Sequence, residues 1–274
     1  MRARNDHVSL THTYPMPESP NGESMESPPS VDNVPTHDRS AATIRNVLVL
    51  ILAFASGYID AISFLAMGSV FTSNMTGNTV LLGLALGEGR GLAALRSVIA
   101  LVGYIGGVAV GSTIVDRGAK RAIWPSSVTA AFAVEFFVLL LFAVGGSVAG
   151  PTPSDFTLYP LIALAAIAMG IQSTAVRVLG VSGVATTYIT GTWTSLVSGL
   201  TKKLTSAASG KEPMQSSLPS GGTVIQAAVV LVYILAAVGG GLLYATLFLD
   251  AAFVPAIGVA LVVVVALLRF RRYR

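Results

Sequence analysis

The 274-residue chain is 53% hydrophobic and only 11% charged, and it carries a formal net charge of +4. Soluble domains contain roughly 25% charged residues, so this composition predicts a membrane protein. The basic excess is typical of the cytoplasmic ends of membrane spans and does not indicate nucleic-acid binding. The sequence has no cysteine, and its three histidines all lie within the range 1–40. We therefore expect no disulfide, and no metal or cofactor in the membrane part.

Residues 1–42 are predicted to form a disordered N-terminal tail. The range 1–40 holds six of the thirteen acidic residues and six of the thirteen prolines. Such a segment buries too little apolar surface to offset the entropy lost on ordering. It also lacks the apolar core of a secretory signal. The membrane domain is therefore expected to cover residues 43–274.

Eight apolar segments follow the tail and predict an all-α polytopic membrane protein. A helix that crosses the bilayer needs about 20 apolar residues, and six segments meet this length. The second and sixth are shorter and rich in Ser, Thr, Asn and Gly, so they are predicted to be broken spans or re-entrant segments. In chain order the segments lie at about 44–67, 70–87, 94–115, 122–148, 158–180, 184–200, 222–249 and 251–268.

The segments also predict two related halves. VFTSNMTGNT at 70–79 aligns with VATTYITGTW at 184–193, and LVGYIGGVAVG at 101–111 aligns with LVYILAAVGGG at 231–241. The second alignment has a larger offset than the first, and the polar loop at 202–221 accounts for the difference. We expect the two repeats at about 44–148 and 158–270.

The number of crossings decides how the halves are oriented. Eight crossings would make the halves parallel, whereas six crossings with two re-entrant segments would make them inverted. The distribution of Lys and Arg between the two sides favours six crossings. The basic end RFRRYR at 269–274 places the C-terminus, and with it the N-terminus, in the cytoplasm under either arrangement.

A face of small residues on the third segment predicts close helix packing. Gly103, Gly107 and Gly111 recur every four residues and therefore share one face of a helix. Such faces allow helix backbones to approach closely in a membrane. The packing is expected either between the two repeats or between two copies of the chain in a homo-oligomer.

The two short segments contain the candidate substrate-binding site. A helix broken inside the membrane exposes backbone amides and the dipole of a half-helix, and transporters with repeated halves bind substrates at such breaks. Alternatively, these polar side chains bond neighbouring helices to each other. The candidate residues are Asn74, Thr76, Gly77 and Asn78 in the first break and Thr187, Tyr188, Thr190 and Gly191 in the second.

Four further polar residues inside apolar segments are candidates for the same site, because charges in the membrane are costly and usually functional. Asp60 and Arg177 lie in related stretches of the two repeats and are predicted to form a gate or charge pair, or a structural ion pair. Glu135, in the centre of the fourth segment, is either a proton-coupling residue or an acid bonded to a neighbouring carbonyl. Gln172 is expected to bond a ligand or another helix.

The run GYIDAISFLAMGSVFTSNMTGNTVLLGLAL at 57–86 and the later MGIQSTAVRVLG resemble the YoaK family, a group of uncharacterised integral membrane proteins with a domain of unknown function. The resemblance covers about 44–270 and implies a polytopic membrane protein without an established substrate. Family members often have Asn where this chain has Ser173. The matching residues are Gly57, Asp60, Ala61, Phe64, Thr76, Gly77, Asn78, Gln172, Arg177, Thr187, Tyr188, Thr190, Gly191 and Thr192.

The sequence contains no catalytic constellation, because no histidine lies in the membrane part and no nucleotide-binding loop or nucleophile elbow is present. The chain is therefore not expected to be an enzyme. The leading hypothesis is a secondary transporter or permease for a small polar or anionic solute, with its site at the paired helix breaks. The alternative is a non-catalytic scaffold or assembly protein that binds partner membrane proteins.

Overall fold

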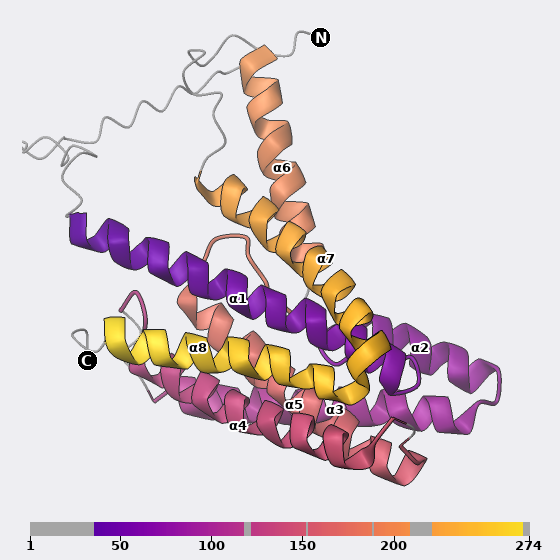
Figure 1. The fold of residues 1–274 in the computed structure, drawn as a ribbon. Coiled ribbons are helices and arrows are strands. Elements are labelled where there is room, and N and C mark those ends of the chain that lie inside the picture. Colours follow the sequence, from indigo (N-terminus) through magenta and orange to yellow (C-terminus); the bar gives the residue numbers. More distant parts are fainter. Residues whose placement is uncertain (1–35, 118–121, 152, 188, 209–220, 271–274) are drawn as a thin grey trace, which may run out of the picture.

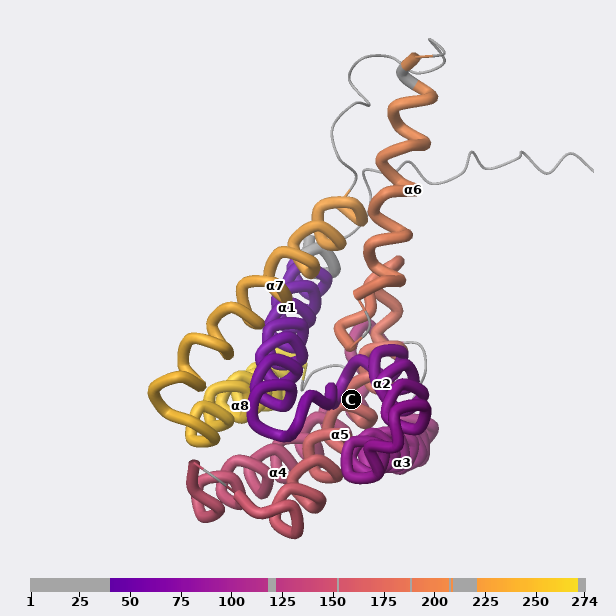
Figure 2. Tube along the Cα trace, turned by 90° about the vertical axis from the view of Figure 1, so that its right-hand side faces the viewer, coloured from indigo at the N-terminus to yellow at the C-terminus, as the bar shows by residue number. Residues whose placement is uncertain are grey.

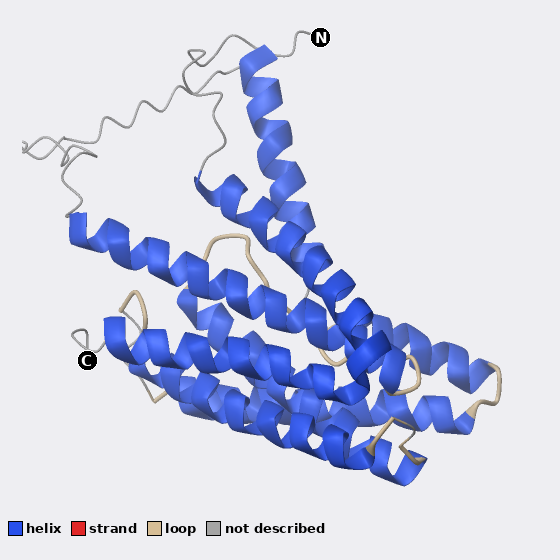
Figure 3. Ribbon diagram, viewed as in Figure 1, coloured by secondary structure: helices blue, strands red, loops and turns tan. Residues whose placement is uncertain are grey.

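The structure is a computed structural model that describes residues 36–117, 122–151, 153–187, 189–208 and 221–270. Every regular element in these ranges is helical, as Figures 1 and 3 show. The all-α class predicted from the sequence is therefore confirmed. The elements are α1 (Thr36–Ala66), α2 (Met75–Gly87), α3 (Gly91–Val115), α4 (Ser126–Ala149), α5 (Asp155–Leu179), α6 (Ile189–Ala208), α7 (Gly221–Leu247), the 3₁₀ turn η3 (Phe248–Ala252) and α8 (Phe253–Arg269).

Among the described residues, five helical stretches are long and apolar enough to cross a membrane, namely Ser40–Ala66, Gly91–Val115, Ser126–Ala149, Asp155–Leu179 and Gly221–Arg269. The protein is therefore a multi-pass integral membrane protein. The last stretch has 49 residues, and a straight helix of that length would exceed the hydrocarbon core of about 30 Å more than twofold. Instead, the chain turns at η3 and α8 runs back beside α4 (Figure 1). The expected count of six spans and two short segments stays a prediction.

The segment boundaries differ most from the sequence prediction at two places. α1 begins at Thr36, so residues 36–42 of the predicted tail are helical, while residues 1–35 lie outside the described part of the chain. α6 continues to Ala208 and therefore includes the first residues of the predicted loop 202–221. Residues 209–220 of that loop are not among the described ones.

The small-residue face of α3 packs against α5 within the same chain. A Cβ atom on Gly103 would meet the main chain of Ala163, and one on Gly107 would meet the main chain of Ile167. Gly111 approaches Ile171 in the same way, so the contact continues along both helices. The predicted close packing thus occurs inside the chain. The prediction that this face joins two copies is not supported, because α5 already covers it.

We expect Gly107→Leu to destabilise the fold, because the new side chain has no room beside Ile167. Overpacking of a tight site costs about 1–3 kcal/mol, and here the obstacle is backbone. Gly106→Leu is the matched control, because a Cβ atom at that neighbouring position meets nothing within 4 Å. The thermal midpoint of the detergent-solubilised protein should fall for Gly107→Leu and stay close to wild type for Gly106→Leu. Equal midpoints for the two variants would contradict the α3–α5 contact.

α1 runs parallel to α7 and antiparallel to α5. Gly57 packs against Tyr233 near the middle of α7, and further along both helices Tyr58 and its neighbours pack against Gly240. By contrast, the first turns of α1 meet the end of α5, where Arg45 donates to the carbonyl oxygen of Leu179 at 3.4 Å. The C-terminal ends of α1 and α5 therefore lie at opposite ends of the bundle.

α2 and α6 differ in how closely they follow the bundle. α2 lies along α3, whereas α6 extends away from the bundle and contacts α7 along only part of its length (Figure 2). α6 is also not one of the five long apolar stretches. Both helices follow directly after a non-helical segment that returns into the interior, and these two segments are the breaks predicted from the sequence.

Candidate functional site

The first break, between α1 and α2, is held in place by Asp60. The side chain of Asp60 is only 4% exposed. Its carboxylate accepts hydrogen bonds from the main-chain N–H groups of Thr72 and Ser73, at 3.0 and 2.8 Å, and from the Ser73 hydroxyl at 2.5 Å. The Tyr233 hydroxyl of α7 donates a fourth bond at 2.6 Å. Asp60 thus ties the break both to α1 and to α7.

The polar residues at the start of α2 also bond the break itself. The Asn78 side chain is fully buried; its amide donates to the Phe71 carbonyl at 2.5 Å and its oxygen accepts from the Phe71 N–H at 2.9 Å. Asn74 caps α2 by accepting from the N–H of Gly77 at 3.1 Å. Thr76 is exposed. The first break therefore uses hydrogen-bonding groups of Asn74 and Asn78 within the break itself.

The second break, between α5 and α6, is tied to α1 by Gln172. Its buried amide donates to the Leu52 carbonyl at 3.0 Å, to the Ser56 hydroxyl at 2.7 Å and to the Thr186 hydroxyl at 3.1 Å. The Gln172 Oε1 atom is buried and has no hydrogen-bond partner among the described residues. Gln172 therefore bonds another helix, as one of the two predictions stated, and its carbonyl oxygen remains an unused acceptor in this part of the chain.

A side chain of α6 closes the second break in the manner of Asn78. The Thr192 hydroxyl accepts from the Ala185 N–H at 3.0 Å and donates to the Ala185 carbonyl at 3.2 Å. Thr190 is exposed and Gly191 is half-buried. Tyr188 lies outside the described residues, so its predicted role is not assessed by the structure.

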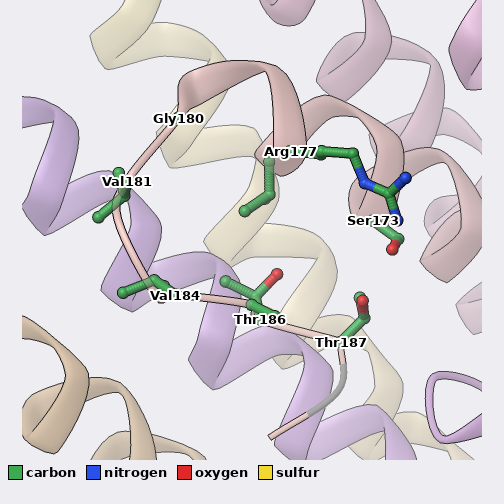
Figure 4. A pocket seen from close by; sticks show the side chains of 9 residues that line it. Ser173, Arg177, Gly180, Val181, Val184, Thr186 and Thr187 are labelled. Carbon is green, nitrogen blue, oxygen red and sulfur yellow. The ribbon is translucent and has the colours of Figure 1, made fainter. Parts of the chain in front are cut away.

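A pocket opens between the end of α5 and the second break. Its volume is about 210 Å³. Figure 4 shows the Arg177 guanidinium and the Ser173 hydroxyl on the α5 side and the hydroxyls of Thr186 and Thr187 on the other side. We call it the Arg177 pocket; its lining is Ser173, Val176, Arg177, Gly180, Val181, Val184, Ala185, Thr186 and Thr187.

A larger pocket of about 510 Å³ adjoins the Arg177 pocket and lies between α3 and α5. Ser173 and Arg177 line both pockets. Polar groups of the larger pocket include the side chains of Tyr104, Ser112 and Asp116. Two of the predicted site residues, Arg177 and Thr187, therefore line the same pocket. Gln172 does not line this pocket, but it bonds the hydroxyl of Thr186, which does.

Asp60 and Arg177 form no ion pair in the described residues. The carboxylate of Asp60 bonds the first break and Tyr233, while Arg177 borders the Arg177 pocket. Both residues lie near the C-terminal ends of their helices, and these ends lie apart because α1 and α5 are antiparallel. The predicted charge pair is thus not formed in this structure.

Glu135 lies in α4. Its side chain is 0% exposed, and neither carboxylate oxygen has a hydrogen-bond partner within the described residues. Its neighbours one turn away on the helix face, Phe132 and Leu139, are also fully buried. The predicted bond to a neighbouring carbonyl is therefore not found in the described part of the chain.

The sequence did not single out Tyr233 and Thr186, although both have a clear place in the structure. Tyr233 is the one hydroxyl-bearing residue in the run AAVVLVYILAAVGGG, and a polar group in such a run is the signal that would have found it. Thr186 was aligned with Thr72 but not chosen, since one sequence gives no sign of which hydroxyl in a polar cluster points inward.

A family model described as "Protein of unknown function (DUF1275)" matches residues 48–266. The chain is also 37% identical over 199 residues to the UPF0700 transmembrane protein YoaK of Bacillus subtilis (strain 168), a match that covers 73% of this chain and 84% of that protein. No solved structure matches the chain. Both breaks lie within the matched residues. The chain therefore belongs to the DUF1275 family, which confirms its resemblance to the YoaK family.

Proposed function

We propose that the protein is a secondary transporter or permease for a small polar or anionic solute, and that the Arg177 pocket is its solute-binding site. The observation that carries this proposal is the pocket itself. A helix break inside a multi-pass membrane protein forms one wall, and a guanidinium and three hydroxyls surround the space. Non-helical backbone at membrane depth is tolerated where it lines such a cavity. A cation with hydroxyl donors favours an anionic or strongly polar ligand.

The proposal includes two related halves, α1–α4 and α5–α8, in inverted orientation. Paired contacts support it. Gly57 of α1 packs on the main-chain carbonyl of Tyr233, and Gly170 of α5 packs on that of Tyr104. α1 packs along α7 of the other half, and α5 packs along α3. The antiparallel arrangement of α1 and α5 favours inverted over parallel halves.

The two breaks supply a second pair of equivalent contacts. Asn78 bonds both main-chain groups of Phe71, seven residues earlier, and Thr192 bonds both main-chain groups of Ala185, also seven residues earlier. The same loop closure thus occurs at equivalent places in the two halves. Inverted repeats with broken helices at the midplane are a common plan of secondary transporters.

Six crossings complete the proposed topology, formed by α1, α3, α4, α5, α7 and α8, with α2 and α6 following re-entrant breaks. The turn at η3 supports two separate crossings by α7 and α8, and Trp124 just before α4 stacks on Phe270 after α8 at 5.2 Å. Both termini then face the cytoplasm, in keeping with the basic C-terminal end. Glu135 is the proposed proton-coupling residue, and no catalytic step is part of the function.

Solute flux into liposomes that contain the purified protein tests this proposal. The panel includes inorganic anions, carboxylates, sugars and amino acids, and we expect saturable flux of at least one anionic or polar solute. Arg177→Gln should reduce this flux at least tenfold. Arg90→Gln is the matched control, because Arg90 is an exposed arginine paired with Glu88 outside the long apolar stretches. No flux across the whole panel, or equal flux in wild type and Arg177→Gln, would overturn the proposal.

A further inference from the structure

We infer that the Arg177 pocket binds the carboxylate group of a small organic acid, at the position that the carboxylate of Asp60 occupies in the other half. The inference rests on the two related halves of the proposed function and names the solute class. It follows from a comparison of the two breaks residue by residue, using the ends of the helices that flank them.

The helix ends set the correspondence between the two breaks. α1 ends at Ala66 and α5 at Leu179, while α2 begins at Met75 and α6 at Ile189. Asp60 stands six residues before the end of α1, and Ser173 stands six residues before the end of α5. Thr72 and Ser73 stand three and two residues before the start of α2, and Thr186 and Thr187 stand at the same distances before the start of α6. The glycines Gly57 and Gly170, which carry the paired tyrosine contacts, each stand three residues before Asp60 and Ser173.

In the first half, a carboxylate of the chain accepts the hydrogen bonds that the break donates. Asp60 accepts from the N–H groups of Thr72 and Ser73, from the Ser73 hydroxyl and from Tyr233. Carboxylates readily accept several such bonds, and bonds to an ionised acceptor are the strong ones. The loop after α1 therefore folds around an acid that belongs to the chain itself.

In the second half the corresponding residues line an open space. The position of Asp60 is taken by Ser173, which lines the Arg177 pocket together with Thr186 and Thr187. Within the described residues, the main-chain N–H groups of Thr186 and Thr187 donate no hydrogen bond. Tyr104, which packs on Gly170 as Tyr233 packs on Gly57, lines the adjoining larger pocket. The second half thus retains the donors and lacks the acid.

The charges of the two halves support the same conclusion. Arg177 stands two residues before the end of α5, and Phe64 stands at the equivalent position of α1. The half with its own carboxylate thus has a phenylalanine at this position, whereas the half without one has an arginine. A carboxylate from solution would pair with Arg177 and accept from Thr186 and Thr187.

The adjoining pocket indicates the rest of the ligand. It gives a ligand held at Arg177 about 510 Å³ more space, with hydroxyl groups of Tyr104, Ser112 and Thr174 in its lining. These hydroxyl groups fit the hydroxyl or other polar groups of a short organic acid.

Thermal unfolding of the detergent-solubilised protein tests this inference, with sodium formate, acetate, lactate and malonate compared with sodium chloride at equal ionic strength. We expect a saturable rise in the midpoint with the monocarboxylates, because a ligand that binds only the folded state stabilises it. Ser173→Asp gives the pocket a carboxylate that belongs to the protein. It should therefore raise the unfolding midpoint without ligand and abolish the response to acetate. Ser173→Asn has the same size without the charge and should not raise the midpoint.

Two results would overturn the inference. One is a wild-type midpoint that is equal in acetate, lactate and chloride, and the other is a Ser173→Asp response to acetate as large as that of wild type. If Ser173→Asp does not fold, Thr187→Val, which removes the counterpart of the Ser73 hydroxyl, should lower acetate affinity at least fivefold. Saturable flux of a sugar or inorganic anion without any carboxylate response would overturn the carboxylate inference and leave the transport proposal standing. A carboxylate response without flux would overturn only the transport proposal.

Discussion

Asp60→Asn is expected to lower the free energy of unfolding by about 3 kcal/mol, because the buried carboxylate accepts four hydrogen bonds and each bond to a charged group contributes about 1.5–3 kcal/mol. An asparagine keeps the shape but turns an NH₂ group toward donors, so at least one buried N–H or O–H loses its partner. The expected loss is less than the sum of the four bonds because neighbours and water compensate in part.

The fluorescence of Trp124, recorded in a Trp193→Phe background because the chain has two tryptophans, reports this unfolding. Trp124 is 2% exposed and lies between Phe132 and Phe270, so the separation of α4 from α8 changes its surroundings. Asp250→Asn is the matched control, because Asp250 is exposed on η3. Tyr233→Phe should cost about 2 kcal/mol, since it removes one of the four donors and leaves the carboxylate three. If Asp60→Asn unfolds with the same free energy as wild type, the carboxylate does not hold the first break.

The class of the protein and the places of its two breaks were predictable because they depend on local sequence. Long apolar runs predict membrane helices from composition alone, and the clusters TSNMTGNT and TTYITGTW interrupt such runs. Helix ends set by a polar cluster and a following N-cap such as Asn74 need no tertiary information. The structure places both breaks within a few residues of these clusters.

Partners across the fold were not predictable in the same way. The sequence placed Asp60 and Arg177 in related stretches, but whether they meet depends on the relative direction of α1 and α5, which one chain does not reveal. Similarly, Gly103, Gly107 and Gly111 predict a close contact without naming the helix that makes it. That helix is α5, so the contact is made inside the chain, which was one of the two places that the sequence left open.

The roles of individual polar residues depend on which atoms are already bonded. Asn78 and Thr187 are equally polar in the sequence and stand in corresponding clusters. In the structure, the side chain of Asn78 bonds Phe71, while Thr187 borders a pocket. The candidate site therefore moves from both breaks to the second one. Only an assignment of every donor and acceptor distinguishes a residue that closes a loop from one that faces a ligand.

Glu135→Leu is expected to raise the free energy of unfolding by about 2 kcal/mol, the reverse of most substitutions in a packed core. A buried polar group without a hydrogen-bond partner costs about 1–3 kcal/mol, and both Glu135 oxygens lack one within the described residues. Leucine is apolar, is similar in size, and faces buried neighbours such as Phe132 and Leu139. Trp124 fluorescence measures the change, and Glu135→Gln is the control because its amide remains a buried polar group and should change stability little.

A gain in stability together with a loss of activity would show that Glu135 is kept for function. We expect Glu135→Leu and Glu135→Gln to abolish solute accumulation driven by a pH gradient across the liposome membrane, while downhill flux continues, because neither side chain exchanges a proton. Stability and coupling then respond differently in the two variants: leucine changes both, and glutamine changes only coupling. If Glu135→Leu instead destabilises the protein, the carboxyl group serves the fold. A proton-driven accumulation equal to wild type in both variants would exclude Glu135 from coupling.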